Sequence, residues 1–158
     1  MPQRFLLCSM ICGIAALATG GCGGDKASGP RVYRVAVIPK GTSHDFWYSV
    51  HAGAKQADEA FDDLAITWKG PATEGDTSEQ IKMVENFLVD GYDGVCLAPL
   101  DAIALRPAVE RALEQKTPVV IFDSALANAA GISSYVATNN YRGGERAGGA
   151  GLCHGRQV

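Results

Sequence analysis

The chain carries little positive charge, and few of its cysteines lie beyond its first 22 residues. It has 14 Lys and Arg against 17 Asp and Glu, a net charge of −3. Subtracting the +1 of Arg4, the only charged side chain of the leader, makes this −4. Such a balance excludes a basic stripe for nucleic acid and a polybasic patch for anionic lipid. Only Cys96 and Cys153 lie beyond residue 22, which excludes a disulfide scaffold.

Patterns typical of catalytic and cofactor sites are also missing. No Gly-x-Ser-x-Gly elbow occurs, and residues 143–148 lack the Lys-Ser/Thr of a P-loop. Residues 149–154 place a histidine at the third glycine position of a dinucleotide loop. The three histidines and Cys153 have no metal-ligand spacing. We therefore expect no enzyme activity, no cofactor and no bound metal.

Residues 1–22 have the pattern of an export signal. One positive side chain, Arg4, precedes an apolar run over residues 5–18. The run is shorter than the ~20 residues that cross a bilayer, and its length is typical of an export signal. The expected location of the folded part is therefore outside the cytoplasm, in the periplasm or on the outer face of the cytoplasmic membrane.

The end of this signal resembles the processing site of a bacterial lipoprotein. Small residues precede Cys22, which we expect to be lipidated and to become the N-terminus. Thr19 stands where such sites prefer Leu, so ordinary cleavage near residues 18–21 remains the alternative. Residues 23–30 have no apolar content and are expected to form a flexible tether.

From residue 31 onward, strand-like and helix-like segments alternate. Short β-branched or apolar runs predict strands over residues 32–38, 64–68, 94–98, 118–122 and 133–137. Apolar residues at spacings of three and four predict helices beginning near residues 46, 77 and 106, the second with Asp76 among its capping residues and a left-handed Gly91 at its end. Asn140 is expected to cap a short fourth helix diluted by glycine. The alternation indicates an α/β fold, a parallel doubly wound sheet with helices on both faces. Residues 31–149 are expected to form this lobe, and residues 150–158 an aberrant tail.

In such a sheet, ligands bind outside the carboxyl ends of the strands, where the winding reverses. The segments that follow the expected strands hold most of the unusual polar and aromatic residues. The candidate ligand-binding residues are Lys40, Ser43, His44, Phe46, Trp47, Asp101, Asp123, Ser124 and Asn139.

Two interpretations of the first of these segments remain open. The expected apolar face of the first helix consists of Phe46, Val50, Ala54, Ala57 and Phe61. If Phe46 packs inward, then at ~100° per residue Trp47 turns outward, where an indole can stack on a sugar ring. In the alternative, Ser43 or Asp45 caps the helix and Trp47 lies over a neighbouring strand.

The later segments also have two interpretations each. Asp123 and Ser124 follow the fourth strand, where a carboxylate could accept hydrogen bonds from vicinal hydroxyls or could simply form a turn. Asp101 fits a helix or turn cap better than a ligand contact. For Asn139 a turn residue, and for Asn140 a helix N-cap, is the favoured interpretation over a ligand contact.

Several stretches together resemble a known family. They are VAVIPKGTSHDFWYSVHAGA, EQIKMVENFLVDGYDGVCLAPLDAIAL, TPVVIFDS and VATNNYRGG. In order and spacing they are similar to the N-terminal lobe of type I periplasmic sugar-binding proteins. This is the group of the ribose-binding protein, whose fold is shared with the effector domains of the lactose-repressor family.

The resemblance implies specific sugar contacts. In the family, the first-strand loop supplies polar groups and two aromatics that sandwich the sugar, and an Asp-Arg pair follows the fourth strand. The matching positions here are Lys40, His44, Phe46, Trp47, Asp123 and Ser124. Ser124 replaces the family's arginine, and Ala98 stands where ribose binders often have Asn.

The implied function is that of the solute receptor of a sugar ABC transporter. Such a receptor binds a monosaccharide or related small polar solute by hinge closure and delivers it to a membrane permease. The family continues with a second lobe of comparable size, so we expect this chain alone to bind poorly. The alternatives are a sensory module for a chemoreceptor or histidine kinase, and a truncated, inactive remnant. The export signal disfavours the effector domain of a transcriptional repressor.

Overall fold

The computed structural model describes residues 30–154, and side chains within residues 30–148. The expected signal with Cys22, the tether as far as residue 29, and residues 155–158 lie outside the described residues. The division of the chain into signal, tether, lobe and tail therefore remains a prediction.

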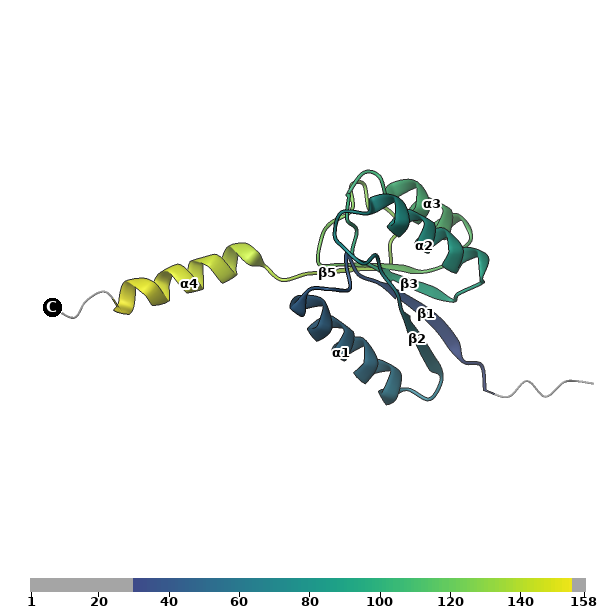
Figure 1. Ribbon diagram of the computed structural model, residues 1–158, viewed down its shortest axis with the longest axis horizontal. Coiled ribbons are helices and arrows are strands. Elements are labelled where there is room, and N and C mark those ends of the chain that lie inside the picture. The colour runs from purple at the N-terminus through teal and green to yellow at the C-terminus, as the bar shows by residue number, and fades with distance from the viewer. Residues whose placement is uncertain (1–29, 155–158) are drawn as a thin grey trace, which may run out of the picture.

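Five strands form one parallel sheet, which confirms the expected fold class (Figure 1). In spatial order they are β2 (Leu64–Trp68), β1 (Tyr33–Ile38), β3 (Gly94–Leu97), β4 (Val119–Phe122) and β5 (Ser134–Val136). The first four agree with the expected ranges to within one residue at either end. The fifth is two residues shorter than predicted, because only residues 134–136 pair with β4.

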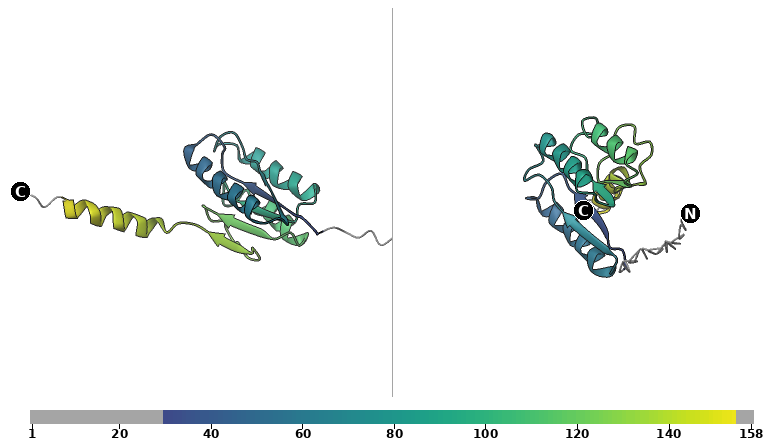
Figure 2. Two further views of the ribbon diagram at one scale, coloured as in Figure 1. Left: turned by 90° about the horizontal axis from the view of Figure 1, so that it is seen from below. Right: turned by 90° about the vertical axis from the view of Figure 1, so that its right-hand side faces the viewer.

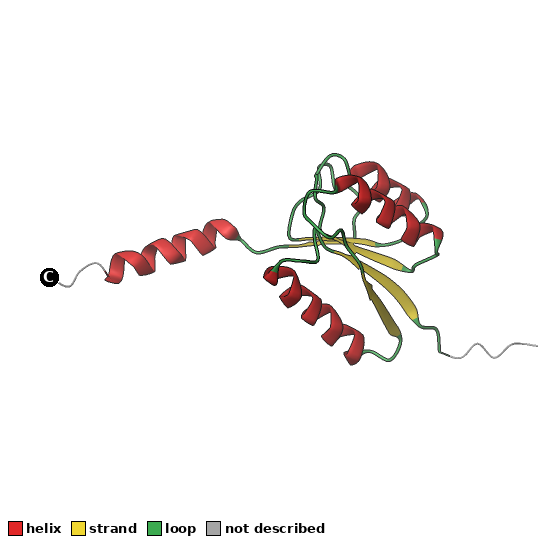
Figure 3. Cartoon of the chain, in the orientation of Figure 1, coloured by secondary structure: helices red, strands yellow, loops and turns green. Residues whose placement is uncertain are grey.

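Helices cover both faces of the sheet, as expected. Figure 3 shows α2 (Thr77–Val89) and α3 (Arg106–Glu114) together on one face and α1 (Asp45–Ala60) on the other. The last helix, α4 (Asn140–His154), projects beyond the carboxyl ends of the strands instead of packing on the sheet (Figures 1 and 2). It was expected to be short, but its helical backbone continues for 15 residues.

The main core lies between the sheet and the α2–α3 layer. Alternate strand residues point into it, which follows from the two-residue period of a β-strand. Its buried members include Ile38, Val95, Leu97, Val119, Ile121, Val84, Phe87 and Val109. The predicted α2 stripe is confirmed, and so are its Asp76 N-cap and the left-handed Gly91 at its end.

The strand order places the winding reversal at β1. From β1 the chain runs to β2 through α1 on one face, whereas α2 and α3 lead to β3 and β4 over the other face. The loops that leave β1 and β3 therefore diverge, and in sheets of this kind ligands bind at this carboxyl edge. This edge is the one that faces α4 in Figure 1.

Candidate functional site

An open hollow of about 570 Å³ lies at the carboxyl edge of the sheet. Segments that follow β1, β4 and β5 build it. Its lining residues are Phe46, Phe122, Asp123, Val136, Ala137, Thr138 and Asn140. Two aromatic rings and a few convergent polar groups are a typical composition for a small-molecule site.

A three-residue polar cluster borders this hollow. The Lys40 Nζ lies 2.8 Å from Asp123 Oδ2 and also donates a hydrogen bond to Ser124 Oγ. Ser124 Oγ in turn donates to Asp123 Oδ2, at 3.1 Å. All three residues are half-buried. Because β3 lies between β1 and β4, the Lys40 side chain must span the end of β3 to make these contacts.

The backbone at Asp123 fixes the direction of its carboxylate. Asp123 has φ +64°, in the left-handed region, which Asp and Asn tolerate better than other non-glycine residues. Its N–H donates to the Val136 carbonyl at 2.9 Å, and the next N–H, of Ser124, donates to the Phe122 carbonyl at 2.8 Å. The chain thus turns sharply as β4 ends, and the carboxylate borders the hollow.

Ser43 serves here to hold two loops together. Its Oγ donates to the Ala72 carbonyl at 2.9 Å, and Thr42 Oγ1 donates to the Pro71 carbonyl at 3.2 Å. These bonds tie the β1–α1 loop to the β2–α2 loop. The hydroxyl of Ser43 is therefore already engaged with backbone.

The prediction that Trp47 turns outward is wrong. Trp47 is 2% exposed, whereas Phe46 is 49% exposed and lines the hollow. The indole packs edge-on against Phe46 and Phe122, with ring centroids 4.9 and 6.4 Å apart, and its Nε1–H donates to Glu74 Oε1 at 2.7 Å. The alternative, in which Trp47 lies over a neighbouring strand, is confirmed. The aromatic side chain available to a ligand is Phe46.

The buried face of α1 therefore includes Trp47 in place of Phe46. Val50, Ala54 and Ala57 are partly buried as predicted, but Phe61 is exposed like Phe46. Since Trp47 is three residues before Val50 and Phe46 is four, either could lie on that face, and the structure selects Trp47.

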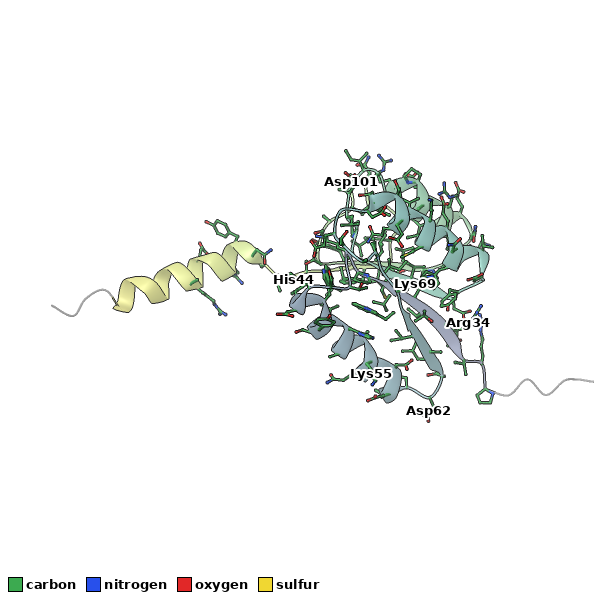
Figure 4. The ribbon with its side chains drawn as sticks, in the orientation of Figure 1. Arg34, His44, Lys55, Asp62, Lys69 and Asp101 are labelled. Carbon is green, nitrogen blue, oxygen red and sulfur yellow. The ribbon has the colours of Figure 1, made fainter. Side chains whose placement is uncertain are left out.

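His44 is the N-cap of α1, where Ser43 or Asp45 was predicted. The His44 Nδ1 accepts a hydrogen bond from the Phe46 N–H at 3.2 Å. The side chain is exposed at the same edge of the sheet as the hollow (Figure 4). It is not among the residues that line the hollow, and its hydrogen bond to Phe46 orders the start of α1 beside it.

Asp101 is a turn cap and lies apart from the lining of the hollow. Its Oδ1 accepts hydrogen bonds from the N–H groups of Ala104 and Ile103, at 2.7 and 2.8 Å. Both bonds stabilise the charged carboxylate and lower the pKa of Asp101. Figure 4 shows Asp101 in the loop before α3, away from His44.

The N-cap of α4 is Asn139, where Asn140 was expected. Asn139 Oδ1 accepts from the Arg142 N–H at 3.0 Å, so Asn139 caps the helix and Asn140 is its first residue. Asn140 lines the hollow and accepts a hydrogen bond from Thr138 at 2.8 Å, whereas Asn139 is not among the lining residues.

Sequence reasoning missed Gln80, whose side chain is wholly buried beneath the site. Its amide contacts the loops that follow β1 and β3. One signal was available: Gln80 occupies the same helical face as Val84 and Phe87, so it is a polar residue in an apolar stripe.

Other reactive groups contribute little within the described part of the chain. Cys96 is a free, half-buried thiol in β3, and burial raises its pKa. Among the described residues, no three His, Cys, Asp or Glu side chains are grouped to hold a metal ion. No helix between residues 30 and 154 is both long and apolar enough to span a bilayer.

Comparison with known families identifies this arrangement. The family model described as a periplasmic binding protein domain matches residues 35–151. The chain belongs to this family. The five parallel strands and the hollow at their carboxyl ends therefore form part of a periplasmic binding protein domain.

The relatives of this periplasmic binding protein domain include named sugar binders. The chain is 35% identical over 99 residues to the D-ribose/D-allose-binding protein of Pseudomonas aeruginosa, covering 62% of this chain and 31% of the relative. A solved ABC transporter solute-binding protein from Agrobacterium vitis with bound D-fucose is 40% identical, with a TM-score of 0.69, over 74% of this chain and 41% of that chain. One from Actinobacillus succinogenes with bound D-allose is 27% identical, with a TM-score of 0.65, over 71% and 41%. The chain thus spans less than half the length of these relatives.

Proposed function

We propose that the hollow at the carboxyl edge binds a neutral monosaccharide or a related small polar solute. The observation that carries the proposal is the Lys40–Asp123–Ser124 cluster beside the rings of Phe46 and Phe122. The two charges are 2.8 Å apart and compensate each other, so the site offers fixed donors and acceptors without a net charge. This suits hydroxyl groups, while the exposed Phe46 ring suits the apolar face of a sugar.

The polar cluster has a specific role in this proposal. Asp123 accepts hydrogen bonds from sugar hydroxyls, and the Lys40 ammonium supplies the cation that the family's arginine provides after the fourth strand. The ammonium lies beside Ser124, which occupies that position in the sequence. The hollow is open on one side, so we expect the described site to bind weakly until hinge closure covers the ligand.

At the level of the cell, we propose that the chain acts in a sugar ABC transporter as the solute receptor, or as part of one. Relatives that are named as ABC transporter solute-binding proteins support this role. The leader supports export, with a lipid anchor at Cys22 and a permease in the membrane as the partner.

A titration of the chain followed by two-dimensional ¹⁵N–¹H spectra tests sugar binding. D-Ribose, D-allose and D-fucose are added in turn, and we expect saturable shifts at Lys40, Phe46 and Asp123 for at least one of them. Lys40→Met should weaken binding about tenfold, which is the loss of one charge-assisted hydrogen bond.

The matched control is Asp62→Asn, which changes a carboxylate at the opposite edge of the sheet (Figure 4). This variant should bind like the unmodified chain. Shifts that are absent, or that are spread equally over both edges for every sugar, would refute the proposed site.

Lipidation is tested separately in cells. Labelled palmitate should be incorporated into the full chain and lost in Cys22→Ala. Unchanged labelling of the variant would rule out Cys22 as the anchor.

A further inference from the structure

Gln80 is the one fully buried polar side chain among the described residues. It lies in the second turn of α2 and points at the carboxyl ends of β1 and β3. Its Nε2 donates to the carbonyls of Pro39 and Ala98, at 3.0 and 2.8 Å. Its Oε1 accepts from the Leu100 N–H at 2.9 Å. Both amide hydrogens and the amide oxygen are thus engaged with backbone.

These contacts occur where the β1–β3 ladder stops. The last bond between the two strands runs from the Ala98 N–H to the Ile38 carbonyl, at 2.9 Å. Beyond it the chain leaves β1 toward α1 and β3 toward α3, on opposite faces of the sheet. Pro39 also has no N–H with which to continue the ladder. Gln80 satisfies the two carbonyls and one N–H that would otherwise be left without partners in the core.

Of glutamine, asparagine, glutamate and methionine, glutamine is the one that supplies the hydrogen-bonding groups required at this position. The gap requires two donors and one acceptor at the end of a side chain that reaches from α2. Asparagine is one carbon shorter, ionised glutamate has no donor, and methionine has the same reach with neither group.

We propose that Gln80 is a positioning residue for the sugar site, an inference that rests on the function proposed above. Pro39, which Gln80 holds through its carbonyl, directly precedes Lys40. Lys40 must cross the end of β3 to reach Asp123, and Gln80 also fixes that end, through Ala98 and Leu100. Through Gln80, α2 thereby sets the distance between the loop after β1, which carries Lys40, and the loop after β3, which Lys40 crosses. Misplacement by about 1 Å is sufficient to weaken a site strongly.

The test compares Gln80→Met with Val84→Ala. Val84 lies one turn further along α2, is also buried, and packs in the apolar core. Without sugar, Gln80→Met should shift the amide resonances of Lys40, Gly41 and Leu100, whereas Val84→Ala should leave them in place. With the best of the three sugars, Gln80→Met should bind about tenfold more weakly, and Val84→Ala within twofold of the unmodified chain.

Gln80→Glu adds a readout that a purely structural role would not produce. A protonated glutamic acid supplies one donor and one acceptor to this gap, and its carboxylate supplies no donor. Sugar affinity of this variant should therefore fall as pH rises through the pKa of the new carboxyl, relative to the unmodified chain at each pH. If Gln80→Met does not fold, this pH profile decides the question, since it is measured at low pH where the variant retains part of the network.

Two outcomes overturn the proposal. In one, Gln80→Met and Gln80→Glu bind sugar like the unmodified chain at all pH values; in the other, they lose no more affinity than Val84→Ala. If the unmodified chain binds none of the sugars, the proposed function fails, and the shifts recorded without sugar still decide whether Gln80 positions the loops.

Discussion

The two halves of the carboxyl edge are built differently. On the β1–β2–β3 side, side chains tie each loop to its neighbour, as Ser43 does for the first two loops and Gln80 for the first and third. Gly70 also approaches Pro39 so closely that a Cβ would lie 2.6 Å from its ring. On the β4–β5 side, every residue from Ser133 to Gly148 is exposed.

This difference separates a preorganised half of the site from an adaptable half. Local stability follows the apolar area and the hydrogen bonds that a segment buries, and all three residues of β5 are exposed. The two halves meet at Asp123, whose carboxylate contacts Lys40 and whose N–H contacts the Val136 carbonyl. We expect the first half to be ordered before ligand arrives and the second to become ordered on binding.

The largest difference in the free energy of unfolding should come from alanine substitutions in the neighbouring strands β4 and β5. Ile121 in β4 is wholly buried, whereas Val136 in β5 is 59% exposed. Ile121→Ala should lower the free energy of unfolding by about 2–5 kcal/mol, and Val136→Ala by less than about 0.5 kcal/mol. Urea unfolding followed by circular dichroism measures both. Equal losses would show that β5 is as firmly packed as β4.

The next effect concerns the close approach of two loops. Gly70→Ala should destabilise the fold by about 1–3 kcal/mol, because the added methyl collides with the ring of Pro39. Gly53, in α1, has nothing within 4 Å of the position that an added Cβ would take, so Gly53→Ala should stabilise by about 0.5–1 kcal/mol. Thermal unfolding of both variants checks the sign. A stabilising Gly70→Ala would contradict a tightly held first half.

A smaller effect is expected at the junction of the two halves. Asp123→Asn and Asp123→Ala both remove the charge that pairs with Lys40, but only Asn tolerates the left-handed backbone. Asp123→Ala should therefore be less stable than Asp123→Asn by about 1 kcal/mol. Chemical unfolding of the two variants side by side gives this difference, and equal stabilities would show that the turn relaxes.

The smallest effect is at the amino ends of the same strands. The Arg34 N–H donates to Asp93 at 2.9 Å, and this bond and the contact with Arg31 hold the pKa of Asp93 below its usual value. A lowered folded-state pKa stabilises the fold above the unfolded pKa of ~3.9, and this contribution is lost as pH falls through the folded value. Asp93→Asn should therefore lose less stability than the unmodified chain between neutral pH and pH of about 3.

Hydrogen exchange at the two pH values measures where this loss occurs. Acid should lower the protection factors, which compare exchange with its intrinsic rate at each pH, more at Arg34 and its neighbours than in β5, which is already exposed. The same acid dependence in Asp93→Asn and the unmodified chain would exclude Asp93 as its source.

Much of the fold could be predicted from local pattern. Two-residue and 3.6-residue periods predicted four strands to within one residue at either end, and the starts of three helices equally closely. Asp76 and Gly91 marked the two ends of α2. The edge that carries the hollow also followed from the alternation of strands and helices. What failed was detail at that edge, where Trp47 was expected outside and Gln80 was not singled out.

The sequence by itself determined which segments become strands and helices, since each depends on residues within a few positions of one another. Only the tertiary structure decided which side chains meet. The helical period allowed either Phe46 or Trp47 to face inward, and Glu74 and Phe122, from two other segments, favoured Trp47. Lys40 and Asp123 meet because the strand order places the ends of β1 and β4 on either side of β3, close enough for the two side chains to reach each other. Contacts between such distant segments arise from the packing of the whole sheet, which a local pattern does not encode.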